Sequence, residues 1–128
     1  MSEVVLDASA LLALLNRELG HEEVARAVPD AAISAVNLSE VAAKLAEGSM
    51  PEEAIREALE GLVLEVHDFG RELAFRTAML RPSTKSRGLS LADRAFLALG
   101  QRLDLPVLTT DRAWEELELE VEVRLIRS

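Results

Sequence analysis

The chain has no cysteine, and only 3% of its residues are aromatic. The absence of cysteine excludes disulfides, thiolate metal sites and cysteine nucleophiles, and it suits a cytoplasmic location. The scarcity of aromatic side chains argues against a surface that binds RNA by stacking its bases. No apolar run approaches the roughly 20 residues of a membrane span, and the first residues lack the basic region of a secretory signal. We therefore expect a cytoplasmic protein without a membrane segment.

Glycine-rich phosphate loops are also missing, because neither GxxxxGK[ST] nor GxGxxG occurs in the sequence. The 128 residues are 49% apolar, which is enough to bury a core and argues against a disordered chain. This length predicts one folded domain that spans residues 1–128.

Positive charge is scarce, and the net charge of −9 argues against a simple electrostatic binder of nucleic acid. The distribution softens this conclusion. Residues 71–112 hold eight Lys or Arg and four Asp or Glu. The rest of the chain holds six Lys or Arg and nineteen Asp or Glu. We call Arg81, Lys85 and Arg87 the basic segment, and Arg112 is a fourth candidate for RNA binding. The basic segment has two possible interpretations. It is either the solvated end of a helix and the loop after it, or a basic surface that binds RNA phosphates beside an acidic cleft.

The spacing of apolar residues predicts an alternation of short strands and helices. The predicted strands cover residues 3–6, 31–35, 63–66, 106–109 and 121–126. The predicted helices cover residues 8–17, 21–28, 37–47, 51–62, 69–80, 90–103 and 111–117, and a polar loop is expected at 82–88. Strands that alternate with helices form parallel βαβ units. The fold class is therefore α/β, a three-layer α/β/α sandwich with a mainly parallel five-stranded sheet.

Four acidic residues stand where an apolar run ends or where a helix is expected to begin: Asp7, Glu40, Asp93 and Asp111. The carboxyl ends of parallel strands meet at one edge of a sheet, where ligands of open α/β folds bind. Carboxylates gathered there repel each other and need a cation. The natural cation for oxygen ligands is Mg²⁺ or Mn²⁺, and one or two such ions can activate water against a phosphodiester.

Each acid also has a purely structural interpretation. Asp7 and Asp111 stand where the N-cap of a helix is expected. Glu40 and Asp93 stand three residues after Asn37 and Ser90, which is the spacing of a capping box. For any single acid capping is the favoured interpretation, and only the joint placement of all four favours a metal site.

Two hydroxyl residues stand within two positions of these acids. Ser9 follows Asp7, and Thr109 precedes Asp111. These hydroxyls could orient the carboxylates without binding the ion themselves. Equally, Ser9 could be an ordinary residue of a first helical turn and Thr109 an ordinary strand residue.

Four segments carry a resemblance to a known family: VVLDASALLALL, NLSEVAAKL, GLSLADRAFLALG and PVLTTDRAW. In order and in spacing they resemble the successive motifs of the PIN-domain family. More narrowly, they resemble the VapC-type toxins of bacterial and archaeal toxin–antitoxin pairs. The resemblance runs from about Val4 to the C-terminus.

The resemblance implies that the four acids are the catalytic, metal-binding residues of an Mg²⁺- or Mn²⁺-dependent endoribonuclease. The family's small hydroxyl and its threonine map onto Ser9 and Thr109. The family also implies a transfer or ribosomal RNA substrate, a small inhibitory antitoxin and a homodimer. From the apolar faces we expect the antitoxin along residues 38–45 and 55–62, and the dimer contact around 74–79 and 91–99.

Two other functions remain open from the residues alone. The first is a non-catalytic α/β binding module whose acids only cap helices. The second is an aspartate-dependent phosphatase with a phosphoenzyme on Asp7. Haloacid-dehalogenase-like phosphatases carry a second Asp two residues after the nucleophile, and here Ser9 occupies that position.

Overall fold

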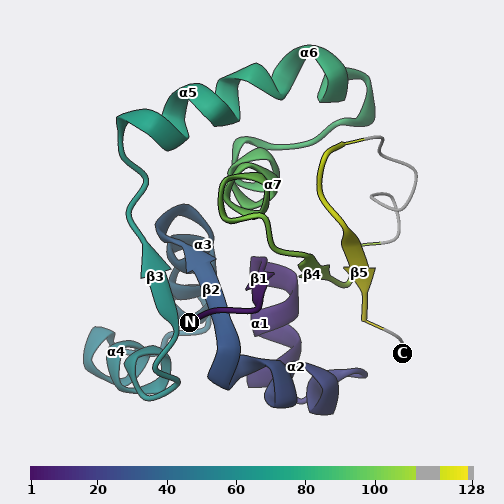
Figure 1. Cartoon of the computed structure of the whole chain (residues 1–128). Helices are drawn as coiled ribbons and strands as arrows, with labels where there is room; N and C mark the ends of the chain where they lie inside the picture. The colour runs from purple at the N-terminus through teal and green to yellow at the C-terminus, as the bar shows by residue number, and fades with distance from the viewer. Residues whose placement is uncertain (112–118, 127–128) are drawn as a thin grey trace.

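The chain forms a five-stranded parallel sheet with helices on both faces (Figure 1). The computed structural model describes residues 1–111 and 119–126. The strand order is β3-β2-β1-β4-β5, and every neighbouring pair is parallel. The strands are β1 Val4–Leu6, β2 Ala31–Ser34, β3 Glu65–His67, β4 Val107–Thr109 and β5 Val123–Leu125. The predicted α/β/α sandwich is confirmed.

The helices of the described residues follow the predicted order closely. They are α1 Ala8–Leu15, α2 His21–Ala27, α3 Ala35–Glu47, α4 Glu52–Glu60, α5 Arg71–Met79, α6 Arg81–Thr84 and α7 Leu91–Leu103, with 3₁₀ turns η1 Val28–Asp30 and η2 Lys85–Arg87. In the part of the chain that the structure describes, no helix has the length and apolar character needed to cross a membrane.

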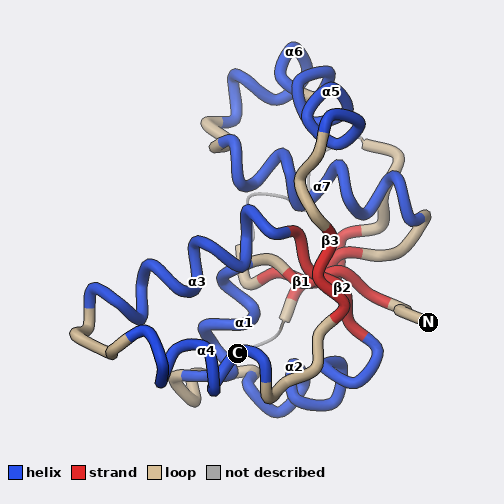
Figure 2. The backbone as a smooth tube through the Cα atoms, turned by 90° about the vertical axis from the view of Figure 1, so that its left-hand side faces the viewer, coloured by secondary structure: helices blue, strands red, loops and turns tan. Residues whose placement is uncertain are grey.

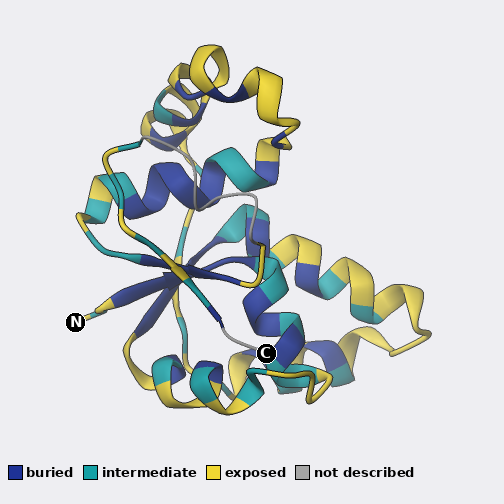
Figure 3. Ribbon diagram, turned by 90° about the vertical axis from the view of Figure 1, so that its right-hand side faces the viewer, coloured by how far each residue is buried: buried dark blue, intermediate teal, exposed yellow. Residues whose placement is uncertain are grey.

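Side chains alternate between the two faces of the sheet, as the period of two in a strand requires. Val5, Ala32 and Val107 belong to a core cluster with α5 and α7. Val4 and Leu108, one position away, pack on the other face with residues of α1 and α2. Figure 2 shows α5, α6 and α7 on one side of the sheet and α1 to α4 on the other. In Figure 3 the central strands are dark blue, and β1, β2 and β4 are buried along their whole length, whereas the edge strands β3 and β5 are partly exposed.

Helix α7 lies very close to the sheet because it carries a glycine at the contact. A Cβ atom added at Gly100 would lie 2.4 Å from Cγ1 of Val107 and 2.9 Å from Cγ2 of Val121. Contacts between real Cβ atoms are not that short, so only glycine fits without a shift of backbone or side chain. Since α7 ends just before the amino end of β4, its first turn lies toward the carboxyl edge of the sheet.

Two predicted segments differ from the structure, and a third lies almost wholly outside the described residues. Residues 81–87 are helical rather than a polar loop, because Pro82 sits in the first turn of α6, where a missing N–H is no loss. The third strand begins two residues later than predicted, since Val63 has a φ of +56° and belongs to the turn after α4. The predicted helix 111–117 falls almost wholly outside the described residues, as does Arg112.

Candidate metal centre at the carboxyl edge of the sheet

The sheet has its switch point between β1 and β4. From β1 the chain moves outward through β2 to β3, then returns to the other side of β1 to form β4 and β5. Asp7 directly follows β1, and Thr109 ends β4. Because β1 and β4 are parallel neighbours, these two residues meet although 102 positions separate them. Open α/β sheets bind ligands at this kind of point.

Asp7 is buried, with 5% of its surface exposed, and both of its carboxylate oxygens accept hydrogen bonds. Oδ1 accepts from the Ser9 hydroxyl at 2.7 Å and from the Ala10 backbone N–H at 2.8 Å. Oδ2 accepts from the Thr109 hydroxyl at 2.7 Å. The bond from Ala10 makes Asp7 the N-cap of α1, so the structural interpretation of this residue is confirmed.

Burial raises the pKa of the Asp7 carboxyl to about 6. The hydrogen bonds from Thr109, Ala10 and Ser9 lower it, and the negative charge of Asp93 raises it slightly. Loss of solvent therefore outweighs three hydrogen bonds that favour the charged form. A nearby cation would reverse this balance, because it would stabilise the carboxylate directly.

The two hydroxyls join the start of α1 to the segment after β4. The Ser9 hydroxyl donates to Asp7 and accepts from the Thr110 backbone N–H at 3.2 Å. The Thr109 hydroxyl donates to Asp7 and accepts from the Asp111 backbone N–H at 3.1 Å. The hydroxyl oxygens of Ser9 and Thr109 are 3.5 Å apart. Since each hydroxyl gives its one hydrogen to Asp7, they fix the carboxylate rather than each other.

Glu40 does not follow a strand directly. It stands six positions after β2, in the second turn of α3, and it is exposed. The N-cap of α3 is Ser34, whose hydroxyl accepts from the Val36 N–H at 3.1 Å, so the capping box expected between Asn37 and Glu40 is wrong. Instead, Asn37 Nδ2 donates to Glu40 Oε1 at 3.2 Å.

Asp93 occupies the third position of α7 and is partly buried. Its Oδ2 accepts from the Ser90 backbone N–H at 2.9 Å, and its own N–H bonds to the Ser90 hydroxyl at 3.1 Å. The predicted capping box is therefore confirmed. Capping does not remove Asp93 from the site, because its charge still acts on Asp7. Asp111 is exposed and lies two residues after β4.

The structure brings these acids together in part. Asp7 and Asp93 are close enough for their charges to interact. Among the described residues, no three His, Cys, Asp or Glu side chains form a group that could hold a metal ion by themselves. Within residues 1–111 and 119–126, no ion pair joins Asp7, Glu40 or Asp93 to a Lys or Arg. The groups that donate hydrogen bonds to these three carboxylates are neutral, so the negative charge stays uncompensated.

The donor set fits a hard divalent cation. All candidate ligands are oxygens. The buried side-chain oxygen of Asn37, Oδ1, has no hydrogen-bond partner in the described part of the chain. Mg²⁺ binds through one or two carboxylates and keeps several of its own waters. A site built around Asp7, with Asp93 near enough for its charge to act on Asp7, suits this mode better than ligation by all four acids directly.

The basic segment lies in α6 and η2, and its three side chains are exposed. It precedes α7, so the chain runs from the basic segment directly into the helix that carries Asp93. In Figure 1, α5 and α6 lie over α7 on the side away from the sheet.

Asn37 is the functional candidate that sequence reasoning missed. Its side chain also donates to the Ala92 backbone oxygen at 3.1 Å, across 55 positions of sequence. The only local signal was its spacing to Glu40, which favoured a helix cap. Contact with Ala92 depends on how α3 packs against α7, and no local pattern predicts it.

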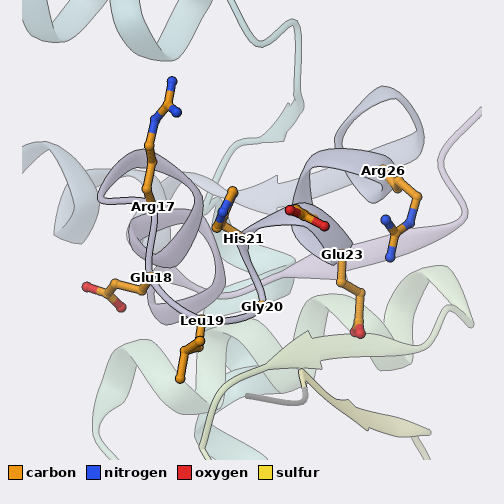
Figure 4. Close-up of a pocket in the computed structure, with 8 residues that line it drawn as sticks. Arg17, Glu18, Leu19, Gly20, His21, Glu23 and Arg26 are labelled. Carbon is orange, nitrogen blue, oxygen red and sulfur yellow. The ribbon is translucent and has the colours of Figure 1, made fainter.

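One pocket lies away from the acids (Figure 4). It has a volume of about 410 Å³ and is formed where α1 ends and α2 begins. Arg17, Leu19, His21 and Arg26 are among its lining residues. Asp7 stands at the other end of α1. None of the four candidate acids lines this pocket, so it does not extend the site.

Comparison with known proteins identifies the same architecture. The model of the PIN-domain family matches residues 4–119. No curated protein matches the sequence. Among solved structures, DNA-bound VapBC from Salmonella typhimurium is 22% identical, with a TM-score of 0.76 over 99% of this chain and 100% of that chain.

Two further solved structures agree in fold. VapBC2 from Rickettsia felis, bound to a promoter DNA fragment, is 16% identical over 97% of this chain and 98% of that one, with a TM-score of 0.73. VapC20 from Mycobacterium tuberculosis, a toxin that cleaves the sarcin–ricin loop, is 17% identical over 94% and 99%, also with a TM-score of 0.73. At these identities the structures establish the fold.

Proposed function

Because the chain belongs to the PIN-domain family, we propose that it is a divalent-metal-dependent endoribonuclease and the toxin of a toxin–antitoxin pair. The observation that carries this proposal is the Asp7 carboxylate. It is buried at the switch point of the sheet, the negative charge of Asp93 acts on it, and its hydrogen-bond donors are all neutral groups. Burying a carboxylate without a compensating cation is unfavourable, and such perturbed groups gather at functional sites.

The catalytic residues in this proposal are Asp7, Glu40, Asp93 and Asp111, which hold Mg²⁺ or Mn²⁺ directly or through water. The ion, when bound, supplies the positive charge that makes water a nucleophile and stabilises the leaving oxygen of the phosphodiester. Ser9 and Thr109 hold both oxygens of Asp7 in place without neutralising them. The capping box fixes Asp93 in the same way.

Metal binding separates this proposal from a module whose acids only cap helices. That alternative has support, since Asp7 and Asp93 do cap α1 and α7. A specific site raises the melting temperature by mass action as Mn²⁺ is added, whereas caps alone give no Mn²⁺-dependent change. A matched titration with Asp7→Asn shows whether a rise depends on this site. A covalent phosphoenzyme trapped on Asp7 would support the phosphatase instead.

RNA binding is assigned to the basic segment, with Arg112 as a fourth contact. The three side chains are exposed and lie on the approach to α7, where they can hold phosphates beside the acids. Phosphate contacts of this kind position the backbone without reading its sequence. We expect transfer or ribosomal RNA as the substrate class by resemblance to the family.

The antitoxin is assigned to a groove between α3 and α4. This groove has a volume of about 410 Å³, and its apolar floor includes Leu38, Ala42, Ile55 and Leu59. An amphipathic helix can place apolar residues at i, i+3 and i+4 into such a groove. An Arg or Lys of the same segment would approach the acids and compete with the metal. Equal affinity with and without saturating Mn²⁺ would mean that the partner does not occupy the metal site.

A homodimer through α5 and the start of α7 completes the proposal. Phe75, Met79 and Leu91 are 66%, 71% and 53% exposed, which is unusual for large apolar side chains. The expected contact at residues 91–99 needs one correction, because 95–99 are buried in this chain's own core and only the beginning of α7 is available. Light scattering at micromolar concentration should give twice the chain mass, and the monomer mass would exclude the dimer.

A further inference from the structure

Asn37 is buried in a position where its polar side chain does not cap its own helix. It is the third residue of α3 and only 1% exposed. The N-cap of this helix is already provided by Ser34. A Leu or Val would fill the space between α3 and α7 without burying polar atoms, so packing alone does not account for an amide here.

The orientation of this amide is determined by its surroundings. Both hydrogens of Nδ2 are used, one for Glu40 Oε1 at 3.2 Å and one for the Ala92 backbone oxygen at 3.1 Å. A carboxylate and a backbone carbonyl can only accept hydrogen bonds, so a flipped amide would face two acceptors with an oxygen. The true orientation leaves Oδ1 buried and without a partner among the described residues. An unsatisfied buried oxygen is unfavourable and calls for an explanation.

Its two partners belong to the two helices that carry candidate acids. Glu40 is on α3, and Ala92 directly precedes Asp93 in the first turn of α7. One side chain therefore connects the exposed carboxylate of Glu40 to the backbone next to a second carboxylate, that of Asp93. Because Asn is neutral, it orients the Glu40 carboxylate without neutralising it. An Arg or Lys at this position would compete with a metal ion for that negative charge.

We propose that Asn37 is a positioning residue: it holds Glu40 Oε1 toward the first turn of α7, and so leaves Oε2 of Glu40 available to the metal. Outer partners of this kind typically change metal affinity about 10- to 100-fold when they are removed. This metal-related consequence rests on the proposed function, whereas the contact between Asn37 and Glu40 does not.

The contact can be tested in metal-free protein by NMR. The chain has two Asn and one Gln, so its ¹⁵N spectrum contains three side-chain amide pairs, from Asn16, Asn37 and Gln101. The pair that disappears in Asn37→Leu belongs to Asn37. Glu40→Ala should shift this pair and speed its exchange with water, and it should leave the Asn16 and Gln101 pairs in place. An unshifted Asn37 pair would overturn the inference, whatever the protein does with metal or RNA.

The metal consequence is tested by titrating Mn²⁺ against wild type and Asn37→Leu. The midpoint of the Mn²⁺-dependent rise in melting temperature should move about 10- to 100-fold upward in the variant. RNA cleavage at saturating Mn²⁺ should return toward the wild-type kcat, because the nucleophile and its ligands are intact. An unchanged midpoint, or cleavage that stays lost at all Mn²⁺ concentrations, contradicts a positioning role.

Thr77→Val is the matched control. Thr77 is 1% exposed, and its hydroxyl oxygen is also buried without a partner in the described residues, but it lies on α5 and contacts none of the acids by hydrogen bond. Replacing it removes a buried oxygen as Asn37→Leu does. Its Mn²⁺ midpoint should equal that of the wild type. A wild type without any Mn²⁺ response would refute the proposed function, and the NMR result would still decide the contact.

Discussion

Replacing Asp7 with Asn should inactivate the protein and, without metal, make it more stable at neutral pH. The reason is the cost of holding a charge in a buried place. The pKa of Asp7 is about 6 in the folded chain and 3.8 in an unstructured aspartate. Between these values the folded protein binds more protons than the unfolded chain. Its stability therefore falls as pH rises from about 4 to about 6, and stays lowered above that.

The size of the effect follows from the pKa difference. A shift of about two units corresponds to roughly 3 kcal/mol of destabilisation at pH 7. Asn can still accept at Oδ1 from Ser9 and Ala10, but its Nδ2 meets the Thr109 hydroxyl in place of an acceptor. Losing that bond costs on the order of 1 kcal/mol. The net gain is therefore about 1–2 kcal/mol, which is several degrees in melting temperature for a chain of this length.

The assay is thermal unfolding in EDTA at pH 7.5 and pH 4, with exposed Asp30→Asn as the control for an ordinary loss of charge. Asp7→Asn should melt higher than wild type at pH 7.5, and this advantage should vanish at pH 4, because Asp7 is then protonated in the folded chain and its burial no longer penalises a charge. Saturating Mn²⁺ should stabilise wild type and not the variant. An equal loss of stability at both pH values would refute the reasoning that burial penalises the charged carboxylate.

Three further results are expected. Gly100→Ala should destabilise the fold by about 1–3 kcal/mol in chemical denaturation, because the added Cβ would overlap Val107. This loss is expected although alanine favours helices. The control is Gly70→Ala, which should be close to neutral because no atom lies within 4 Å of the added Cβ. Val63→Gly should stabilise by roughly 1 kcal/mol in the same assay, since Val63 is 83% exposed and strained at φ +56°, and a loss would show that its side chain matters. Alanine at all three positions of the basic segment should flatten the salt dependence of RNA binding by about 0.7 in log–log slope per lost phosphate contact, and an unaltered slope would place the RNA elsewhere.

The sheet and its carboxyl edge were predictable because they depend on local patterns. Short apolar runs that alternate with helical periodicity imply parallel βαβ units, and these bring the ends of β1 and β4 together without any knowledge of contacts. The meeting of Asp7 and Thr109 follows from this topology. The capping box at Ser90 and Asp93 was equally local, because both partners lie within three residues.

The segments that sequence reasoning misplaced depend on competing local choices or on packing. Pro82 predicts a break after α5, yet the same residue is well suited to start a new helix. Asn37 looks like a helix cap, but Ser34 lies closer to the strand and takes that position. The bond from Asn37 to Ala92 requires α3 and α7 to be packed first. For that reason the connection between Glu40 and the first turn of α7 could not be read from the sequence.

The central claim is tested most directly by cleavage of RNA in a titration with Mn²⁺. Purified wild type should cut no RNA in EDTA and should gain activity as Mn²⁺ is added. Asp7→Asn and Asp93→Asn should both remain folded, by circular dichroism, and should both be inactive at every Mn²⁺ concentration. Cleavage by both variants at the wild-type rate would contradict the account, because the two neighbouring carboxylates would then hold no metal that the reaction needs.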